Sequence, residues 1–105
     1  MKEISVSELK DWRDNGVAFQ LIDVREPYEY EICHLGGELI PMAEVMDHVD
    51  RISRDKKVVV HCRSGKRSAS VIRALEQLHG FDNLFNLEGG VLAWADEIDP
   101  EMPKY

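Results

Sequence analysis

Three consecutive valines near the middle of the chain limit the folds that it can adopt. Val58, Val59 and Val60 stand together with no polar residue between them. A strand with one face in water alternates apolar and polar side chains, whereas a strand of a parallel sheet is buried on both faces and is apolar throughout. We therefore predict that residues 57–62 form a buried strand of a parallel sheet.

Strand and helix patterns alternate along the rest of the chain. Ser5 and Glu8 have the spacing of a capping box, which predicts a helix directly after Ser5. A later segment has apolar residues at helical spacing, and we expect Met42 and Met46 there to fill the core. Strands that alternate with helices form a parallel sheet covered on both faces, so we predict the α/β class. The predicted strands are 17–24, 39–40, 57–62 and 84–87, and the predicted helices are 6–14, 27–33, 41–52 and 91–98. A further helix, closed by Gly80, follows the loop after Cys62, and its apolar stripe is Val71, Ile72, Leu75 and Leu78.

Length and charge bound the domain organisation and the partners. The 105 residues suit one domain over 1–105, in which 100–105 form a short tail. Twenty acidic and thirteen basic residues give a formal charge of −7, which disfavours nucleic acid and anionic membranes as partners. No segment has the apolar length of a signal peptide or a membrane span, so we expect a cytoplasmic protein. We favour a monomer.

The basic residues gather in one segment. Residues 51–73 hold eight basic side chains and one acidic side chain, a net charge of +7, whereas the remaining residues sum to −14. A cationic segment in an acidic protein suits a small anionic ligand, although a solvated helix face has the same pattern.

The loop that follows the predicted central strand carries the candidate site. Cys62 ends the strand, and Arg63-Ser64-Gly65-Lys66-Arg67 leads into an amphipathic helix. Ligands of open α/β sheets bind at this edge of the sheet. A tight turn into a helix directs successive backbone N–H groups toward one point, and Gly65 permits the backbone angles of such a turn. We expect this loop to hold an anion, and a thiolate of Cys62 is such an anion.

Cys62 needs help from this loop to act as a nucleophile. A free cysteine has a pKa of about 8.5, so little of it is thiolate at neutral pH. Lowering that pKa to about 6.5 takes roughly 2.7 kcal/mol, of which a helix terminus supplies up to about 2. Backbone hydrogen bonds and nearby cations must supply the rest. We do not expect His61 to be the base, because neighbouring residues of a strand point to opposite faces.

Several segments, taken in order and spacing, form one pattern over almost the whole chain. They are Ser5 to Leu9, Leu21 to Glu26 with Glu29-Tyr30, His34 to Gly37 with Ile40-Pro41, Cys62 to Arg67, and Glu88 to Gly90 with Trp94. The pattern resembles the rhodanese family of thiosulfate and related sulfurtransferases. The resemblance implies a rhodanese-like three-layer fold, in which helices cover both faces of a central parallel five-stranded sheet. It also implies that Cys62 is the catalytic cysteine, which carries sulfur as a persulfide.

Loop length separates two chemistries of this fold. Related phosphatases and arsenate reductases have five residues between cysteine and arginine, whereas four residues separate Cys62 from Arg67. The resemblance therefore implies transfer of a sulfane sulfur from a small anionic donor such as thiosulfate to cyanide, a thiol or a protein. A carrier module that a desulfurase loads is the alternative, and a phosphatase or arsenate reductase is less favoured. The interpretation requires an accessible Cys62 sulfur in a cradle too small for phosphate.

The residues after the cysteine receive roles in this hypothesis. Backbone amides of 63–67 hold the thiolate and the persulfide, and Arg63 and Lys66 attract the anionic donor. Ser64 either donates to a bound oxyanion or caps the helix. Arg67 either completes the cradle or pins the loop to the body of the domain. No metal or organic cofactor is needed, because sulfur itself is the transferred group.

Four further polar residues have structural interpretations that we favour over functional ones. We expect Ser68 to cap the helix after the loop. Asp23 and Arg25 lie at another strand end, where an ion pair that holds the loops is favoured over a role in the site. Cys33 is expected to be a small buried thiol rather than a partner that resolves the persulfide.

Overall fold

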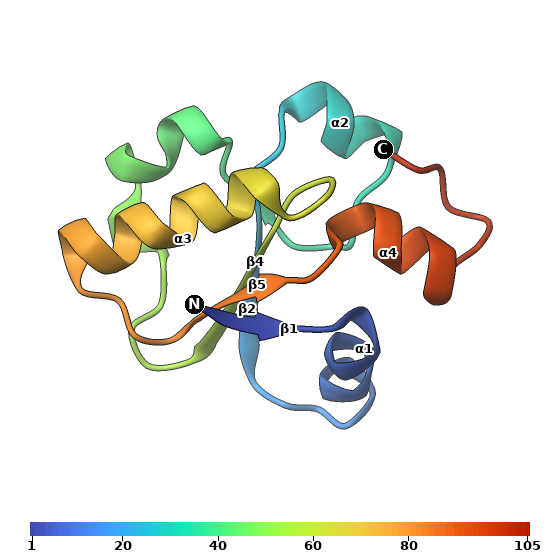
Figure 1. Cartoon of the computed structure of the whole chain (residues 1–105), viewed down its shortest axis with the longest axis horizontal. Coiled ribbons are helices and arrows are strands. Elements are labelled where there is room, and N and C mark those ends of the chain that lie inside the picture. Colours follow the sequence, from blue (N-terminus) through green and yellow to red (C-terminus); the bar gives the residue numbers. More distant parts are fainter.

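A computed structural model describes residues 1–105 as one five-stranded sheet with helices on both faces (Figure 1). All neighbouring strands run parallel, in the order β1-β5-β4-β2-β3. The predicted α/β class is therefore confirmed. The strands are β1 (Lys2–Ile4), β2 (Phe19–Asp23), β3 (Glu38–Leu39), β4 (Lys57–His61) and β5 (Leu84–Leu87). The helices are α1 (Val6–Asp14), α2 (Pro27–Ile32), α3 (Lys66–His79) and α4 (Gly90–Glu97), and two 3₁₀ helices are η1 (Met42–Asp47) and η2 (Val49–Arg51).

The valine run forms the middle of the sheet, as predicted. Val58, Val59 and Val60 are all buried, and their side chains alternate between two core clusters. Val58 and Val60 pack with apolar residues of α3, including Ile72, whereas Val59 packs in the cluster that contains residues of α1 and α4, including Leu9. Helices on opposite faces thus hold the sheet, and burial of both faces explains why the middle of this strand, Val58 to Val60, carries no polar residue.

One edge strand is not recognisable from the sequence pattern. β1 has three residues, pairs with β5, and buries only Ile4. A strand this short shows no hydrophobic period, so only its pairing with β5 identifies it. The helix that follows agrees with the prediction, because Ser5 and Glu8 form the predicted capping box.

The prediction for residues 41–52 is wrong in two respects. The segment forms the 3₁₀ helices η1 and η2 instead of one α-helix. Met42 and Met46, expected in the core, are 42% and 40% exposed. A 3₁₀ helix has three residues per turn, so side chains that share one face of an α-helix separate here. Val45 and Ile52 of this segment belong to the core, and the partly buried Val49 packs against it.

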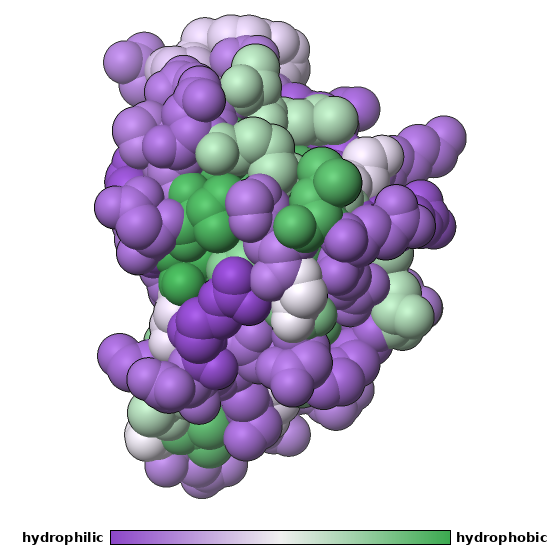
Figure 2. Space-filling model, turned by 90° about the vertical axis from the view of Figure 1, so that its left-hand side faces the viewer, coloured by the Kyte–Doolittle hydropathy of each residue, from purple (hydrophilic) through white to green (hydrophobic).

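The apolar spacing of the sequence also fails to predict one exposed leucine and the packing of the C-terminal segment. Leu78 continues the helical spacing of the buried Val71, Ile72 and Leu75 but is itself 71% exposed. Apolar side chains also interrupt the mainly hydrophilic face in Figure 2.

The segment 100–105 folds back, and its residues Met102 and Tyr105 pack against the cluster that contains α1 and α4 residues. None of the helices combines the length and the apolar character that crossing a membrane requires.

Candidate active site

The candidate loop lies where β4 ends and α3 begins. Gly65 is the residue before the helix and has a φ of 104°, in the left-handed region that favours glycine. Its N–H donates to the Sγ atom of Cys62 at 3.1 Å. The loop thus turns a backbone donor onto the sulfur, which is the arrangement that its sequence predicts.

Ser68 and Asn86 lie beneath the loop. The Ser68 Oγ atom lies 3.5 Å from the Cys62 sulfur and donates to Asn86 Oδ1 at 2.6 Å. Asn86 in turn donates to the carbonyl of Gly65 at 3.1 Å. The expectation that Ser68 caps the helix is wrong, because Gly65 occupies the cap position and Ser68 is buried under the sulfur. Asn86 lies on β5, and no pattern in the sequence marks it as part of the site.

The start of α4 holds the other side of the loop. The N–H groups of Val91 and Leu92 donate to the carbonyls of Cys62 and Arg63, both at 3.1 Å. Gly90 permits this approach, because a Cβ atom there would lie 2.5 Å from the Cys62 carbonyl oxygen. A substituent on Gly90 would therefore push the cysteine loop away from α4.

The Cys62 side chain is less accessible than the sequence analysis requires. Cys62 is only 1% exposed, so the expectation of an accessible sulfur is wrong for this conformation. The sulfur contacts the amide of Gly65 and the hydroxyl of Ser68, whereas Arg63, Ser64 and Lys66 of the loop are exposed. The sulfur therefore lies below the surface, and a reactant reaches it only when part of the structure around it moves.

Burial and hydrogen bonding shift the pKa of the Cys62 thiol in opposite directions. Burial raises the pKa of Cys62, because it penalises the charged thiolate. Hydrogen bonds from the Ser68 hydroxyl and from the amides of Ser68, Gly65 and Ser64 lower the pKa, and the net direction is down. The Ser68 proton cannot serve Asn86 and the thiolate at once, so this hydroxyl must turn toward the sulfur when Cys62 ionises.

Replacing Ser68 tests this account of the thiolate. The alkylation rate of Cys62 is expected to rise with pH and level off above a midpoint that lies below the ordinary thiol range, because only the thiolate reacts. Ser68→Ala is expected to move the midpoint upward and slow alkylation at neutral pH roughly threefold to tenfold. The measurement is the rate of iodoacetamide labelling as a function of pH, in protein that also carries Cys33→Ala so that only Cys62 is labelled. An unchanged midpoint in Ser68→Ala would show that the hydroxyl stays with Asn86.

Arg67 pins the loop to α2. Its two terminal nitrogens lie 2.7 and 2.9 Å from the two carboxylate oxygens of Glu29, which is buried. This bidentate pair lowers the pKa of Glu29, chiefly through the hydrogen bond from Arg67, and raises that of Arg67. Of the two roles considered for Arg67, the geometry matches the one that fixes the loop. Glu29 itself was not predicted to take part.

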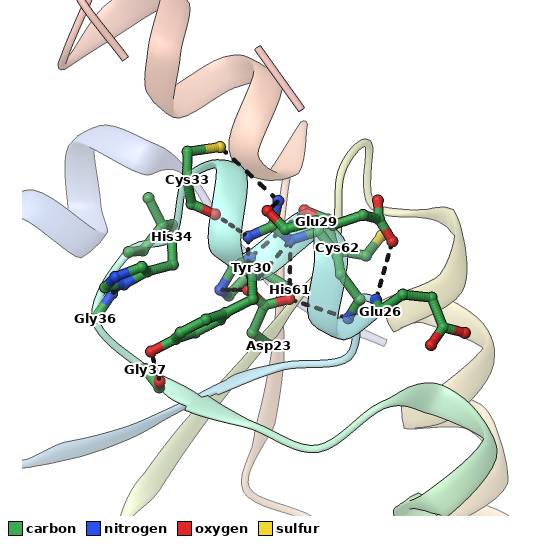
Figure 3. A network of polar contacts seen from close by, with 12 residues as sticks. Asp23, Glu26, Glu29, Tyr30, Cys33, His34, Gly36, Gly37, His61 and Cys62 are labelled. Atoms are coloured by element: carbon green, nitrogen blue, oxygen red, sulfur yellow. Dashed lines mark hydrogen bonds and ion pairs between the residues drawn. The ribbon is translucent and has the colours of Figure 1, made fainter. Parts of the chain in front are cut away.

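A second, fully buried cluster joins the end of β2 to α2 (Figure 3). Arg25 is 0% exposed and donates to both carboxylate oxygens of Asp23, with the shortest contact at 2.8 Å. It also donates to the carbonyl of Cys33 at 2.7 Å. The pair is structural, as favoured from the sequence, and it fixes the helix that carries Glu29.

Two side chains that sequence reasoning weighed as reactive groups belong to this cluster. Burial lowers the pKa of His61 to about 4, and its Nε2 atom lies 3.8 Å from Asp23 with no hydrogen-bond partner. The Cys33 sulfur lies 3.9 Å from a nitrogen of Arg25, and both cysteines are free thiols. Neither side chain contacts the Cys62 sulfur. No three His, Cys, Asp or Glu side chains lie together as a metal ion would need.

An open pocket of about 390 Å³ lies beside the loop. Of the predicted binding residues, Arg63 and Arg67 line it, whereas Ser64, Gly65 and Lys66 do not. The remaining lining residues are Glu26, Tyr28, Glu29 and Tyr105. The sequence predicts Tyr105 as part of a short tail. Its contact with the loop is long-range and leaves no local pattern, so the sequence does not indicate it.

Known proteins match the chain along nearly its full length. The family model described as "Rhodanese-like domain" matches residues 5–97. The Bacillus subtilis protein "Putative sulfurtransferase YtwF" is 35% identical over 102 residues, which cover 96% of this chain and 97% of that protein. The crystal structure of a rhodanese-like domain protein from Staphylococcus aureus has a TM-score of 0.83 at 32% identity, and covers 93% of this chain and 95% of that one.

Some relatives are much longer. The Mycobacterium tuberculosis protein "Probable adenylyltransferase/sulfurtransferase MoeZ" is 37% identical over 105 residues, which cover 97% of this chain but only 26% of that protein. The chain thus spans about a quarter of the length of this relative. The five-stranded parallel sheet, the cysteine loop and the full-length matches agree, and the chain belongs to the family of rhodanese-like sulfurtransferase domains.

Proposed function

We propose that the protein moves a sulfane sulfur from a donor such as thiosulfate to a nucleophilic acceptor through a persulfide on Cys62. The observation that carries the proposal is the four-residue loop between Cys62 and Arg67, in which the Gly65 N–H donates to the cysteine sulfur. This donor stabilises a thiolate, and it stabilises the anionic persulfide in the same way. The match to sulfurtransferase relatives supports the same chemistry.

The first half of the cycle is a displacement at sulfur. The Cys62 thiolate attacks the outer sulfur of thiosulfate, a bond forms between these two sulfurs, and the bond to the sulfite group breaks. Sulfite leaves with the bonding electron pair, and Cys62 becomes a persulfide. The acceptor then attacks the outer sulfur of that persulfide, and Cys62 leaves as a thiolate. The two halves balance without a metal, an oxidant or an organic cofactor.

The buried sulfur makes loop movement part of this cycle. The donor reaches Cys62 when the exposed Ser64 shifts outward, while the hydrogen bonds of Asn86 to Gly65 and of α4 to the carbonyls of Cys62 and Arg63 stay in place. Arg63 and Lys66 attract the dianionic donor to this point. Arg67 remains paired with Glu29 and keeps the end of the loop in position.

Mass spectrometry tests the proposal directly. Reduced protein incubated with thiosulfate is expected to gain the mass of one sulfur atom, and to release one sulfite for each sulfur gained. Cyanide is expected to remove that sulfur and appear as thiocyanate. A protein that stays at its original mass after long incubation, and releases no sulfite, contradicts transfer from thiosulfate.

A carrier that accepts sulfur only from a desulfurase is the second candidate. The closed loop over Cys62 favours it, because a protein donor can open a loop that a small anion leaves shut. A relative at 30% identity over 98 residues, the Bacillus subtilis "Putative sulfur carrier protein YrkF", also supports it. Persulfide formation with a desulfurase and cysteine, but not with thiosulfate, would identify a carrier. Cys62-dependent hydrolysis of an aryl phosphate would instead identify a phosphatase.

A further inference from the structure

Two charged side chains of the pocket beside the loop, one acidic and one basic, have no ion-pair partner in the protein. Glu29 and Arg67 line it but satisfy each other through their bidentate pair. Glu26 has no basic group within ion-pair distance, and in Figure 3 its carboxylate points away from the buried cluster. Arg63 likewise has no acidic partner. The pocket therefore offers a carboxylate and a guanidinium that form no ion pair within the protein.

Aromatic rings hold this arrangement. The Arg63 guanidinium lies over the ring of Tyr105, 5.5 Å from its centroid. Tyr105 packs edge to face against Tyr28, with ring centroids 6.0 Å apart. Tyr28 lies on α2, and Figure 1 shows the end of the chain beside this helix. The two rings form a wall of the pocket and keep Arg63 at its rim.

These charges argue against a simple anion as the molecule that fills the pocket. A dianion that Arg63 draws toward the loop would be repelled by the carboxylates of Glu26 and Glu29 if it settled in the pocket, so the donor passes this pocket without being held in it. A molecule with an ammonium and a carboxylate group can pair with Glu26 and Arg63 at once. The volume of about 390 Å³ lies in the range of sites for small organic molecules.

We propose that the sulfur acceptor is a small thiol that carries both an ammonium and a carboxylate group, as cysteine and homocysteine do. Glu26 pairs with the ammonium, and Arg63 on Tyr105 pairs with the carboxylate. This inference rests on the proposed Cys62 persulfide. The acceptor thiolate attacks the outer sulfur of that persulfide, a new sulfur–sulfur bond forms, and Cys62 leaves as a thiolate. The product is the persulfide of the small thiol, so no oxidant or reductant is consumed.

A panel of matched thiols tests the charge requirement. Protein loaded with thiosulfate is discharged by cysteine, by cysteamine, which lacks the carboxylate, and by 3-mercaptopropionate, which lacks the ammonium. Discharge rates are compared per thiolate, because the thiols differ in pKa. The discharge rate is expected to saturate at a cysteine concentration about threefold to tenfold lower than the concentration needed of either analogue. Equal saturation by all three thiols would overturn the proposal.

Single substitutions assign each charge to its residue. Glu26→Gln is expected to lower the ratio of cysteine to 3-mercaptopropionate discharge, and Arg63→Gln the ratio of cysteine to cysteamine discharge, each about threefold to tenfold. Tyr105→Leu is expected to resemble Arg63→Gln, whereas Tyr105→Phe keeps the ring and the wild-type ratio. Glu31→Gln, on an exposed part of α2 outside the pocket, is the matched control.

The controls separate this inference from the function on which it rests. Sulfur loading by thiosulfate and discharge by cyanide measure the Cys62 persulfide without any thiol acceptor. If loading and cyanide discharge proceed but Glu26→Gln and Arg63→Gln leave the thiol ratios unchanged, the acceptor assignment is wrong and sulfur transfer stands. If the wild-type protein itself gains no sulfur from thiosulfate, the proposed function is wrong.

Discussion

Cys62→Ala is expected to abolish persulfide formation, so that no sulfur is gained from thiosulfate and no sulfite is released. The thiolate is the nucleophile, and no neighbouring side chain in the site can replace it. Ser68 is the polar side chain in hydrogen-bond contact with the sulfur, at 3.5 Å, but it carries a hydroxyl bonded to Asn86. A hydroxyl has a far higher pKa than a thiol, so Cys62→Ser is expected to be equally inactive.

Cys33→Ala is the matched control for this loss. Cys33 is also a buried free thiol, but its sulfur faces Arg25 rather than the loop amides. Intact mass and cyanolysis of the two variants are therefore expected to differ completely, with full loading in Cys33→Ala and none in Cys62→Ala. Urea denaturation of both variants shows whether the loss reflects chemistry or unfolding. Sulfur retained by folded Cys62→Ala would place the persulfide on another residue and contradict the proposal.

The sequence predicts those parts of the site that depend on local backbone geometry. Val58 to Val60 identify the central strand because both faces of that strand are buried. Gly65 identifies the turn because its φ of 104° disfavours other residues. Both signals lie within a few residues of the structure that they specify, so sequence alone suffices to find them.

The features that sequence reasoning missed depend on contacts between distant segments. Glu29 lies 38 positions from Arg67, and nothing local to α2 indicates that its carboxylate reaches the loop. Tyr105 similarly meets Tyr28 and Arg63 only after the chain has folded. The closed position of Cys62 has the same origin, because α4 and Asn86 of β5 draw the loop inward. Tertiary packing, rather than the loop sequence, sets the access to the sulfur.

Arg25→Met is expected to destabilise the fold by about 3–5 kcal/mol, a large part of the stability of an ordinary domain. The substitution keeps an apolar stem of similar length but leaves the buried carboxylate of Asp23 without its partner. It also removes the donor to the Cys33 carbonyl, which ties α2 to the end of β2. Urea denaturation followed by circular dichroism measures the loss.

An exposed ion pair supplies the comparison that isolates burial as the cause. Arg51 and Glu38 also form a close pair, at 2.6 Å, but both side chains are more than a third exposed. Arg51→Met is therefore expected to cost less than about 1 kcal/mol, because water solvates the carboxylate that remains. Adding Asp23→Asn to Arg25→Met is expected to recover part of the larger loss, since it removes the unpaired buried charge. Equal costs for Arg25→Met and Arg51→Met would show that Asp23 stays solvated without Arg25. In that case the buried pair would not be what anchors α2, and with it Glu29 and the cysteine loop.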